Sequence, residues 1–241
     1  MDKKVITAAG ILIVIVCIII ACFQIMDDKN ISKETNVIKD VQELSVKTLA
    51  DRGKGKLLVV YFSVPETDGV DASSGASRIL SDGKVMGNTQ YLANIISEAT
   101  GSDIFEIKTG HTYPGTHKEL IEAAKVEIDN DVRPELVTHI ENLKDYEVVF
   151  VGFPNWWYDM PMPLYTFFDE YDFSGKIVIP FCTHGGSRFS DAIKTIRELE
   201  KEALVFDGYA VARDYVADSK DDVLRWLEGL GIRIKDENLK R

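Results

Sequence analysis

After residue 56, short apolar runs alternate regularly with longer amphipathic runs, and this alternation constrains the fold more than any other feature of the sequence. Five apolar runs are predicted to be buried strands: 57–62, 103–108, 146–153, 176–183 and 204–212. Five runs with helical spacing of their apolar residues are predicted to be helices: 88–99, 117–129, 162–171, 190–201 and 219–230. Strands separated by helices predict an α/β protein in which helices cover both faces of a parallel sheet.

The order of these elements also predicts where a binding site can lie. Right-handed crossover connections restrict the topology to a doubly wound, three-layer sandwich. In such sheets ligands bind beyond the carboxyl ends of the strands, at the point where the strand order reverses. The loops after the first, third and fourth predicted strands are therefore the expected locations of functional residues.

The loop after the first predicted strand begins at Ser63 and reaches Gly87, Asn88 and Thr89 only after the long stretch 64–86. Backbone N–H groups at a helix start, together with hydroxyl and amide side chains, can bind a phosphate without Lys or Arg. Because loop-closure entropy rises slowly with length, the stretch can bulge outward as a flap while Ser63 and Gly87 remain neighbours. The alternative is that Asn88 only caps the helix.

The loop after the third predicted strand contains Pro154, Asn155, Trp156 and Trp157. Indole rings bury a large area and prefer offset stacking, so they can cover the face of a planar aromatic ligand. Adjacent side chains tend to point to different sides, and we therefore expect at least one of the two Trp rings to face a ligand. The alternative is that both pack under the following helix.

The loop after the fourth predicted strand contains Thr183, His184, Gly185 and Gly186. The glycine N–H groups have little steric shielding and can bind the edge of a polar heterocycle. His184 could act as a general acid or base, but the favoured interpretation is an exposed loop residue. An ordinary turn is the alternative for the whole loop.

The three loops would bring together a phosphate site, an aromatic surface and backbone donors for a polar heterocycle at one edge of the sheet. This combination fits a flavin mononucleotide, FMN.

Three segments resemble the flavodoxin-like family, and the resemblance covers about residues 56–232: VVYFS…GNTQYLA, VFVGFPNWWYDMPMPLYTFFDEYDFSGK and VIPFCTHGGS. It implies bound FMN and a five-stranded parallel sheet with strand order 2-1-3-4-5. It also implies three FMN-binding groups: Ser63, Gly87, Asn88 and Thr89 at the phosphate, Pro154, Asn155, Trp156 and Trp157 at the first flavin-flanking loop, and Thr183, His184, Gly185 and Gly186 at the second. The family's phosphate loop is compact, so the stretch 64–86 departs from its pattern.

Tyr113 and Pro114, after the second predicted strand, admit two interpretations. They could reach the same sheet edge and shape a substrate pocket over the flavin. They could equally belong to a simple loop that leads to a helix capped near Thr116.

The N-terminal segment 1–26 contains an uncharged, largely apolar run after Lys3 and Lys4. Its length suits a bilayer, which needs about 20 apolar residues. The sequence IIAC, residues 19–22, resembles the bacterial lipobox, which implies lipidation of Cys22; the alternative is an uncleaved signal anchor. We expect a membrane-attached, exported protein in which residues 27–55 form a spacer and residues 233–241 a polar tail.

Composition limits the remaining function classes. The net charge of −11 argues against nucleic acid as a partner, because phosphate backbones are bound by Lys and Arg. Cys182 follows an apolar run and is expected to be a core residue, and no zinc-binding spacing or other metal site is predicted. No residue is assigned a catalytic role, because the redox chemistry would belong to FMN.

The predicted function is that of an FMN-binding redox protein, tethered to a membrane. It would act as an electron carrier or as a reductase of a small, quinone-type acceptor, and its partner would be a redox protein or that acceptor. The alternative is a flavin-free, ligand-binding lipoprotein with the same fold.

Overall fold

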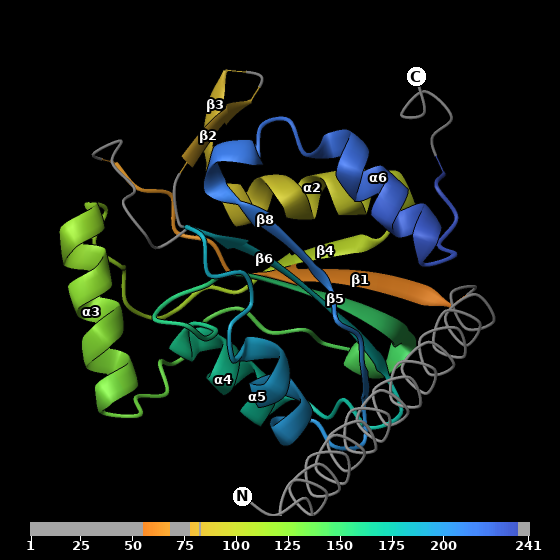
Figure 1. The fold of residues 1–241 in the computed structure, drawn as a ribbon. Coiled ribbons are helices and arrows are strands. Elements are labelled where there is room, and N and C mark those ends of the chain that lie inside the picture. The colour runs from red at the N-terminus through yellow and green to blue at the C-terminus, as the bar shows by residue number, and fades with distance from the viewer. Residues whose placement is uncertain (1–54, 68–77, 82, 236–241) are drawn as a thin grey trace, which may run out of the picture. The chain divides into compact units, whose positions relative to one another are not determined.

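The centre of the protein is a parallel sheet, as seen in a computed structural model that describes residues 55–67, 78–81 and 83–235 (Figure 1). The strands run in the order β4-β1-β5-β6, and two short strands, β7 and β8, both pair with β6. Their bounds are β1 (Lys56–Tyr61), β4 (Asp103–Glu106), β5 (Tyr146–Pro154), β6 (Ile177–His184), β7 (Leu204–Val205) and β8 (Tyr209–Ala212). The predicted parallel α/β sheet is confirmed.

The fifth predicted strand, 204–212, is the part of the sheet that differs most from the prediction. Its residues form β7 and β8, separated by a short irregular segment at Gly208, which adopts a left-handed backbone with φ of +76°. A Cβ at this position would lie 2.1 Å from the carbonyl oxygen of Pro180. The strand therefore breaks where its backbone approaches β6 too closely for any side chain.

Helices cover both faces of the sheet, which confirms the predicted three-layer sandwich. In Figure 1, α2 and α6 lie on one face, α4 and α5 on the other, and α3 stands near the end where the strands finish. The helices are α2 (Asn88–Thr100), α3 (His117–Asp129), α4 (Met162–Glu170), α5 (Ala192–Leu199) and α6 (Lys220–Gly229), with short 3-10 helices η1 (Leu143–Asp145) and η2 (Arg213–Tyr215).

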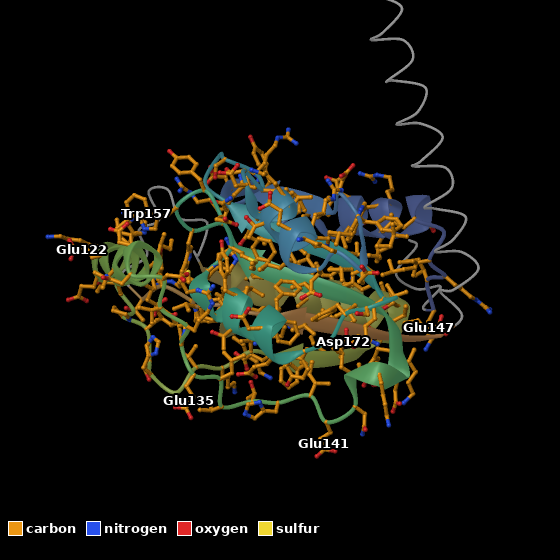
Figure 2. All side chains as sticks on the ribbon, turned by 90° about the horizontal axis from the view of Figure 1, so that it is seen from below. Glu122, Glu135, Glu141, Glu147, Trp157 and Asp172 are labelled. Carbon is orange, nitrogen blue, oxygen red and sulfur yellow. The ribbon has the colours of Figure 1, made fainter. Side chains whose placement is uncertain are left out.

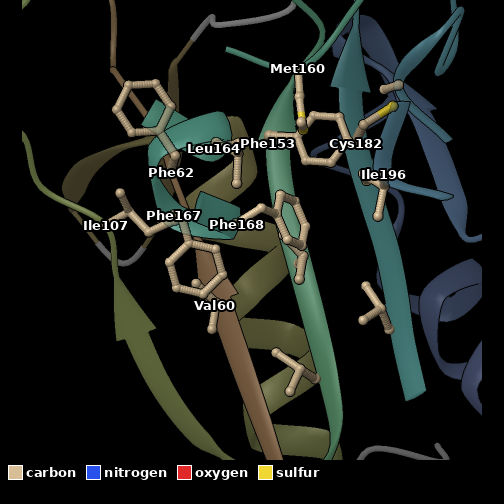
Figure 3. Close-up of a cluster of buried hydrophobic side chains, with 14 of the residues drawn as sticks. Val60, Phe62, Ile107, Phe153, Met160, Leu164, Phe167, Phe168, Cys182 and Ile196 are labelled. Carbon is tan, nitrogen blue, oxygen red and sulfur yellow. The ribbon is translucent and has the colours of Figure 1, made fainter. Parts of the chain in front are cut away.

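Alternation along β1 divides the apolar interior into two cores. Leu58 and Val60 belong to the core on the side of α4 and α5, whereas Val59 and Tyr61 belong to the core beneath α2 and α6. This is the side-chain period of a strand that is buried on both faces. Figure 3 shows the first core, in which Cys182 lies among aromatic and aliphatic side chains. Burial there raises the pKa of the Cys182 thiol, as befits the predicted core residue.

Part of the stretch 64–86, expected to form a loose flap, has regular structure. Strands β2 (Arg78–Ser81) and β3 (Lys84–Gly87) form an antiparallel hairpin that leads directly into α2. The paired residues Ile79 and Met86 share one face of the hairpin, and Ile79 packs against the core beneath α2. The hairpin forms because this apolar face can be buried, which the small polar residues of the stretch did not reveal.

Predictions at the two termini fall mostly beyond the described residues. The proposed signal or anchor 1–26 with Cys22, all of the spacer except Gly55, and the tail beyond Lys235 lie outside them. Within the described part of the chain, none of the helices combines the length and hydropathy that crossing a bilayer would require.

Gly152, near the carboxyl end of β5, shows how closely β5 and β6 are packed. Phe181 of β6 lies opposite Gly152 in the strand pairing, and its ring is fully buried. One carbon of this ring lies 2.1 Å from the position that a Cβ on Gly152 would occupy. Gly152→Ala should therefore lower the free energy of unfolding by about 1–3 kcal/mol, measured by urea denaturation. Gly229→Ala, whose Cβ would meet no atom, is the matched control and should not destabilise the protein. Equal stability of the two variants would contradict this packing.

Candidate functional site

A cavity of about 390 Å³ lies beyond the carboxyl ends of β5 and β6. Its walls come from the loop after β5, the loop after β6 and one side of α3. The lining residues are Leu120, Ile121, Ala124, Asn155, Trp156, Trp157, Tyr158, Gly185, Gly186 and Ser187. Five residues predicted from the two flavin-flanking loops therefore line the same space, as expected for loops at one edge of a parallel sheet.

The two ends of the stretch 64–86 meet beside the start of α2. A Cβ on Gly87 would lie 2.0 Å from the Oγ of Ser63, so only glycine allows this approach. The expectation that Ser63 and Gly87 remain neighbours is confirmed. Helix α2 begins at Asn88 with Gly87 at its N-cap, so the alternative that Asn88 caps the helix is wrong. The first backbone N–H groups of a helix have no partner within it and can bind an anion.

A hydrogen bond connects the start of α2 with the end of β6. The hydroxyls of Thr89 and Thr183 lie 2.9 Å apart, and both side chains are buried. This hydrogen bond thus joins the predicted phosphate-binding residues, which include Thr89, to the predicted second flavin-flanking loop, which includes Thr183. Seven of the predicted residues do not line the cavity, and they lie along the strand ends and the start of α2: Ser63, Gly87, Asn88, Thr89, Pro154, Thr183 and His184.

The two adjacent indoles occupy different environments. Trp156 is only 2% exposed and packs edge-on against Phe62 and Tyr113 at centroid distances of 5.5 Å and 5.3 Å. Its Nε1 has no hydrogen-bond partner among the described residues. Trp157 is 44% exposed, and its Nε1 donates to the carbonyl of Ile121 in α3 at 3.0 Å. Figure 2 shows Trp157 beside α3. Trp156 is therefore a core residue that also borders the cavity, whereas Trp157 forms a partly exposed part of the cavity wall.

The Trp157 ring is presented by a tight turn with an unusual backbone. Trp157 and Tyr158 have φ values of 52° and 69°, and reciprocal hydrogen bonds between Trp156 and Asp159 close the turn. Left-handed backbone at bulky residues costs about 1–3 kcal/mol each and persists where surrounding contacts enforce it. Asp159 supplies those contacts, because its carboxylate accepts hydrogen bonds from Tyr165 and Thr195 at 3.0 Å and 2.9 Å.

The loop after β6 is held by two side chains that had been assigned other roles. His184 is 5% exposed, so its interpretation as an exposed loop residue is wrong. Its Nδ1 accepts a hydrogen bond from the N–H of Gly186 at 2.9 Å. Asn155 donates from Nδ2 to the carbonyl of Arg188 at 2.8 Å. Burial, together with the charge of Arg188, lowers the pKa of His184, which favours the neutral imidazole.

Beneath α3, a buried polar cluster fixes the helix to the loop before it. Tyr113 donates its hydroxyl to the Glu127 carboxylate, with distances of 2.7 Å and 2.9 Å to the two oxygens, and His111 lies 3.2 Å from one of them. Burial raises the pKa of Glu127, although its hydrogen bonds act in the opposite direction. Tyr113 packs against Trp156 rather than lining the cavity, so it supports the wall from behind.

A second buried pair attaches the start of α3 to the segment that follows Ser63. Glu66 Oε1 lies 2.8 Å from Nδ1 of His117, and both residues are buried. The N–H of Thr67 also donates to the carbonyl of Gly115 at 2.7 Å. Sequence reasoning missed both pairings because no local pattern joins residues so far apart in the chain.

The geometry favours binding of a planar, largely apolar group rather than a metal. The cavity volume falls within the range of about 300–1,000 Å³ typical of small-molecule sites. No described residue accepts a hydrogen bond from the N–H of Gly185 or Ser187, which leaves two donors at the cavity wall. Among the described residues, no cluster of three His, Cys, Asp or Glu side chains could hold a metal ion.

Comparisons with known proteins agree with this architecture. The family model for flavodoxin matches residues 79–230. A "Putative flavoprotein" from Bacteroides uniformis is 27% identical, with 72% of this chain and 98% of that chain covered and a TM-score of 0.56. A similar protein from Bacteroides eggerthii is 22% identical, covers 74% and 99% of the two chains, and has a TM-score of 0.55, which supports the fold alone. None of the curated proteins compared with the chain matches it.

The matched segment contains every helix of the sandwich and all strands of the sheet except β1. It also contains eleven of the twelve predicted FMN-binding residues, and Ser63 is the one that precedes it. Since the match extends over more than half of the 241 residues, the chain belongs to the flavodoxin family.

Proposed function

We propose that this protein binds FMN and transfers electrons, either as an electron carrier or as a reductase of a small, quinone-type acceptor. The observations that carry the proposal are the apolar cavity lined by the loops after β5 and β6 and the hydrogen bond that joins Thr89, at the start of α2, to Thr183 near the end of β6. Membership of the flavodoxin family and the likeness to a "Putative flavoprotein" support it.

The residues present fit the two chemically different parts of FMN. Trp157 and the glycines at 185 and 186 border a cavity suited to a flat aromatic ring, and the free N–H groups of Gly185 and Ser187 could bind its polar edge. Ser63 and the start of α2 at Gly87 offer hydroxyl and backbone donors suited to a phosphate. The absence of a side chain at Gly87 lets the Ser63 hydroxyl lie against the start of α2.

Bound FMN would supply the electron transfer, and the protein would bind the ring, orient it and exclude water. The turn that carries Trp157 and the loop at 185–187 would form opposite walls for the ring. Leu120 and Ile121 of α3 make a third, apolar wall of the cavity, which suits a planar acceptor of low polarity. None of these side chains is an acid or base, in keeping with a role in binding rather than in proton transfer.

We further propose that the N-terminal segment attaches this domain to a membrane and that the domain is exported. The apolar run before residue 27 and the lipobox-like residues 19–22 support this proposal. A tether of this kind would keep the flavin site close to acceptors dissolved in the bilayer.

The absorption spectrum of the full-length protein, purified in detergent, tests the cofactor. We expect a yellow protein with flavin bands, or a colourless protein that acquires those bands when incubated with FMN. A protein that stays colourless would contradict the proposal and favour a flavin-free, ligand-binding lipoprotein. For a protein that does bind FMN, turnover of a reduced nicotinamide nucleotide with a quinone would distinguish a reductase from a carrier.

Comparison of FMN with riboflavin, which lacks the phosphate, separates the two halves of the site. Ser63→Ala should weaken FMN binding about tenfold and leave riboflavin binding unchanged, because one hydrogen bond to a charged group is lost. Trp157→Ala should weaken both about 30-fold, or ~2 kcal/mol, because aromatic surface is lost. Quenching of flavin fluorescence gives the dissociation constants.

The control for these variants is Val137→Ala, which shortens an exposed apolar side chain that does not line the cavity. Its affinities should equal those of the wild type. An equal loss of affinity for FMN and riboflavin in Ser63→Ala would show that Ser63 does not bind the phosphate. Unchanged affinities in Trp157→Ala would show that Trp157 does not contact the flavin ring.

Mass spectrometry of the protein isolated from bacterial membranes tests the tether. Cys22 should be the lipid-modified N-terminal residue, and Cys22→Ala should retain the residues before it, because cleavage depends on lipidation. An unmodified wild-type protein that still begins at Met1 and stays in the membrane would instead establish the signal anchor. A wild-type protein recovered in the soluble fraction would contradict membrane attachment in either form.

A further inference from the structure

His184 ends β6 at the point where the chain turns into the cavity wall. Gly185, Gly186 and Ser187 line the cavity, whereas His184 does not. It lies instead in a hollow on the other side of the loop, which is also lined by residues of β8, η2 and α6. His184 contacts a segment that lines the cavity but does not line the cavity itself. It can therefore affect binding only by changing the position of that segment.

The contact between His184 and this segment is a single directed hydrogen bond. The N–H of Gly186 donates to Nδ1 of His184 at 2.9 Å, which requires an unprotonated Nδ1. Gly186 has a φ of 137°, a conformation that side chains rarely adopt. Glycine can adopt this conformation without steric cost, and the hydrogen bond to His184 forms in it.

The other end of the same segment is also fixed. Asn155 donates to the carbonyl of Arg188 at 2.8 Å, and Arg188 itself has a φ of 54°. His184 and Asn155 thus hold the segment from the ends of two paired strands. The N–H groups of Gly185 and Ser187 between these two attachment points are left without an acceptor among the described residues.

We infer that His184 is a positioning residue, which rests on the proposed function: through Gly186, it aims the N–H donors of the 185–187 segment at the polar edge of the bound flavin. It is not a catalytic residue, since it does not line the cavity. Its imidazole must be neutral with Nδ1 free, because a protonated ring would point a second N–H at that of Gly186 and break the bond.

The surroundings of His184 decide when this protonation occurs. The charged and titratable groups that share its hollow are Arg188 of the loop, Tyr209 of β8, Tyr215 of η2 and Asp222 of α6. Burial and Arg188 lower the pKa of His184 below its ordinary value. The stabilising bond is therefore fully present above that ordinary value and is lost as pH falls through the lowered pKa.

Riboflavin binding by the full-length protein in detergent, measured from about pH 8 down to the lowest pH at which the protein remains folded, tests the inference. Riboflavin is the probe because it has no phosphate that titrates in this range. In His184→Asn, the Oδ1 can take the place of Nδ1 as acceptor but does not titrate. Wild-type affinity should fall about tenfold toward acid pH, whereas His184→Asn should stay tight throughout and His184→Leu should be weak throughout, by the loss of one hydrogen bond.

A second readout uses the ligand-free protein. The amide resonance of Gly186 should titrate with pH in the wild type and stay constant in His184→Asn, because only the former loses its hydrogen bond. The control His139→Asn changes an exposed histidine far from the cavity lining and should keep the wild-type profile in both measurements.

The outcomes separate this inference from the proposed function. A pH profile in His184→Asn that matches the wild type, or wild-type affinity in His184→Leu, would overturn the positioning role. If His184→Leu does not fold, the comparison of His184→Asn with the wild type decides the question. Failure of the wild type to bind riboflavin or FMN at any pH would overturn the proposed function, while the Gly186 resonance would still test whether His184 fixes the loop.

Discussion

The parallel pairing of β5 with β6 is the constraint on which the rest of the site depends. The two strands are in register from Val148 opposite Ile177 to Pro154 opposite Thr183, so both end at the same level. Their following loops therefore leave the sheet side by side and form facing walls of one cavity. Gly152 permits this pairing to stay close, because a ring from β6 occupies the space of its missing side chain.

The loops are positioned by polar side chains from the framework rather than by their own sequence. Asn155 and His184 hold the loop after β6, Asp159 holds the turn after β5, and the Thr89–Thr183 hydrogen bond joins the start of α2 to the sheet. Each such bond contributes only about 1 kcal/mol net. Together they hold the loops in place and allow strained residues such as Trp157 to persist.

Sequence reasoning predicted which loops would meet at one edge of the sheet, but it misjudged the burial of His184 and left the placement of the two indoles undecided. It placed Ser63 next to Gly87 across a long stretch of chain, which the structure confirms, because loop closure depends weakly on loop length. It treated His184 as exposed, because a histidine after a strand and before two glycines carries no local sign of burial. It could not tell which indole was in the core, because that depends on Phe62 and Tyr113, which come from elsewhere in the chain.

By itself the sequence determined the class of fold and the order of the helices and strands along the chain, and it predicted which three loops lie at one edge of the sheet. These follow from patterns with a short period, such as apolar runs, helical spacing and turn residues, which neighbouring residues create. The tertiary structure alone decided the partners of the buried polar groups: Thr89 with Thr183, Glu66 with His117, and Asn155 with the carbonyl of Arg188. These pairs are 94, 51 and 33 residues apart, and such contacts exist only once the packed sheet has brought distant strand ends together.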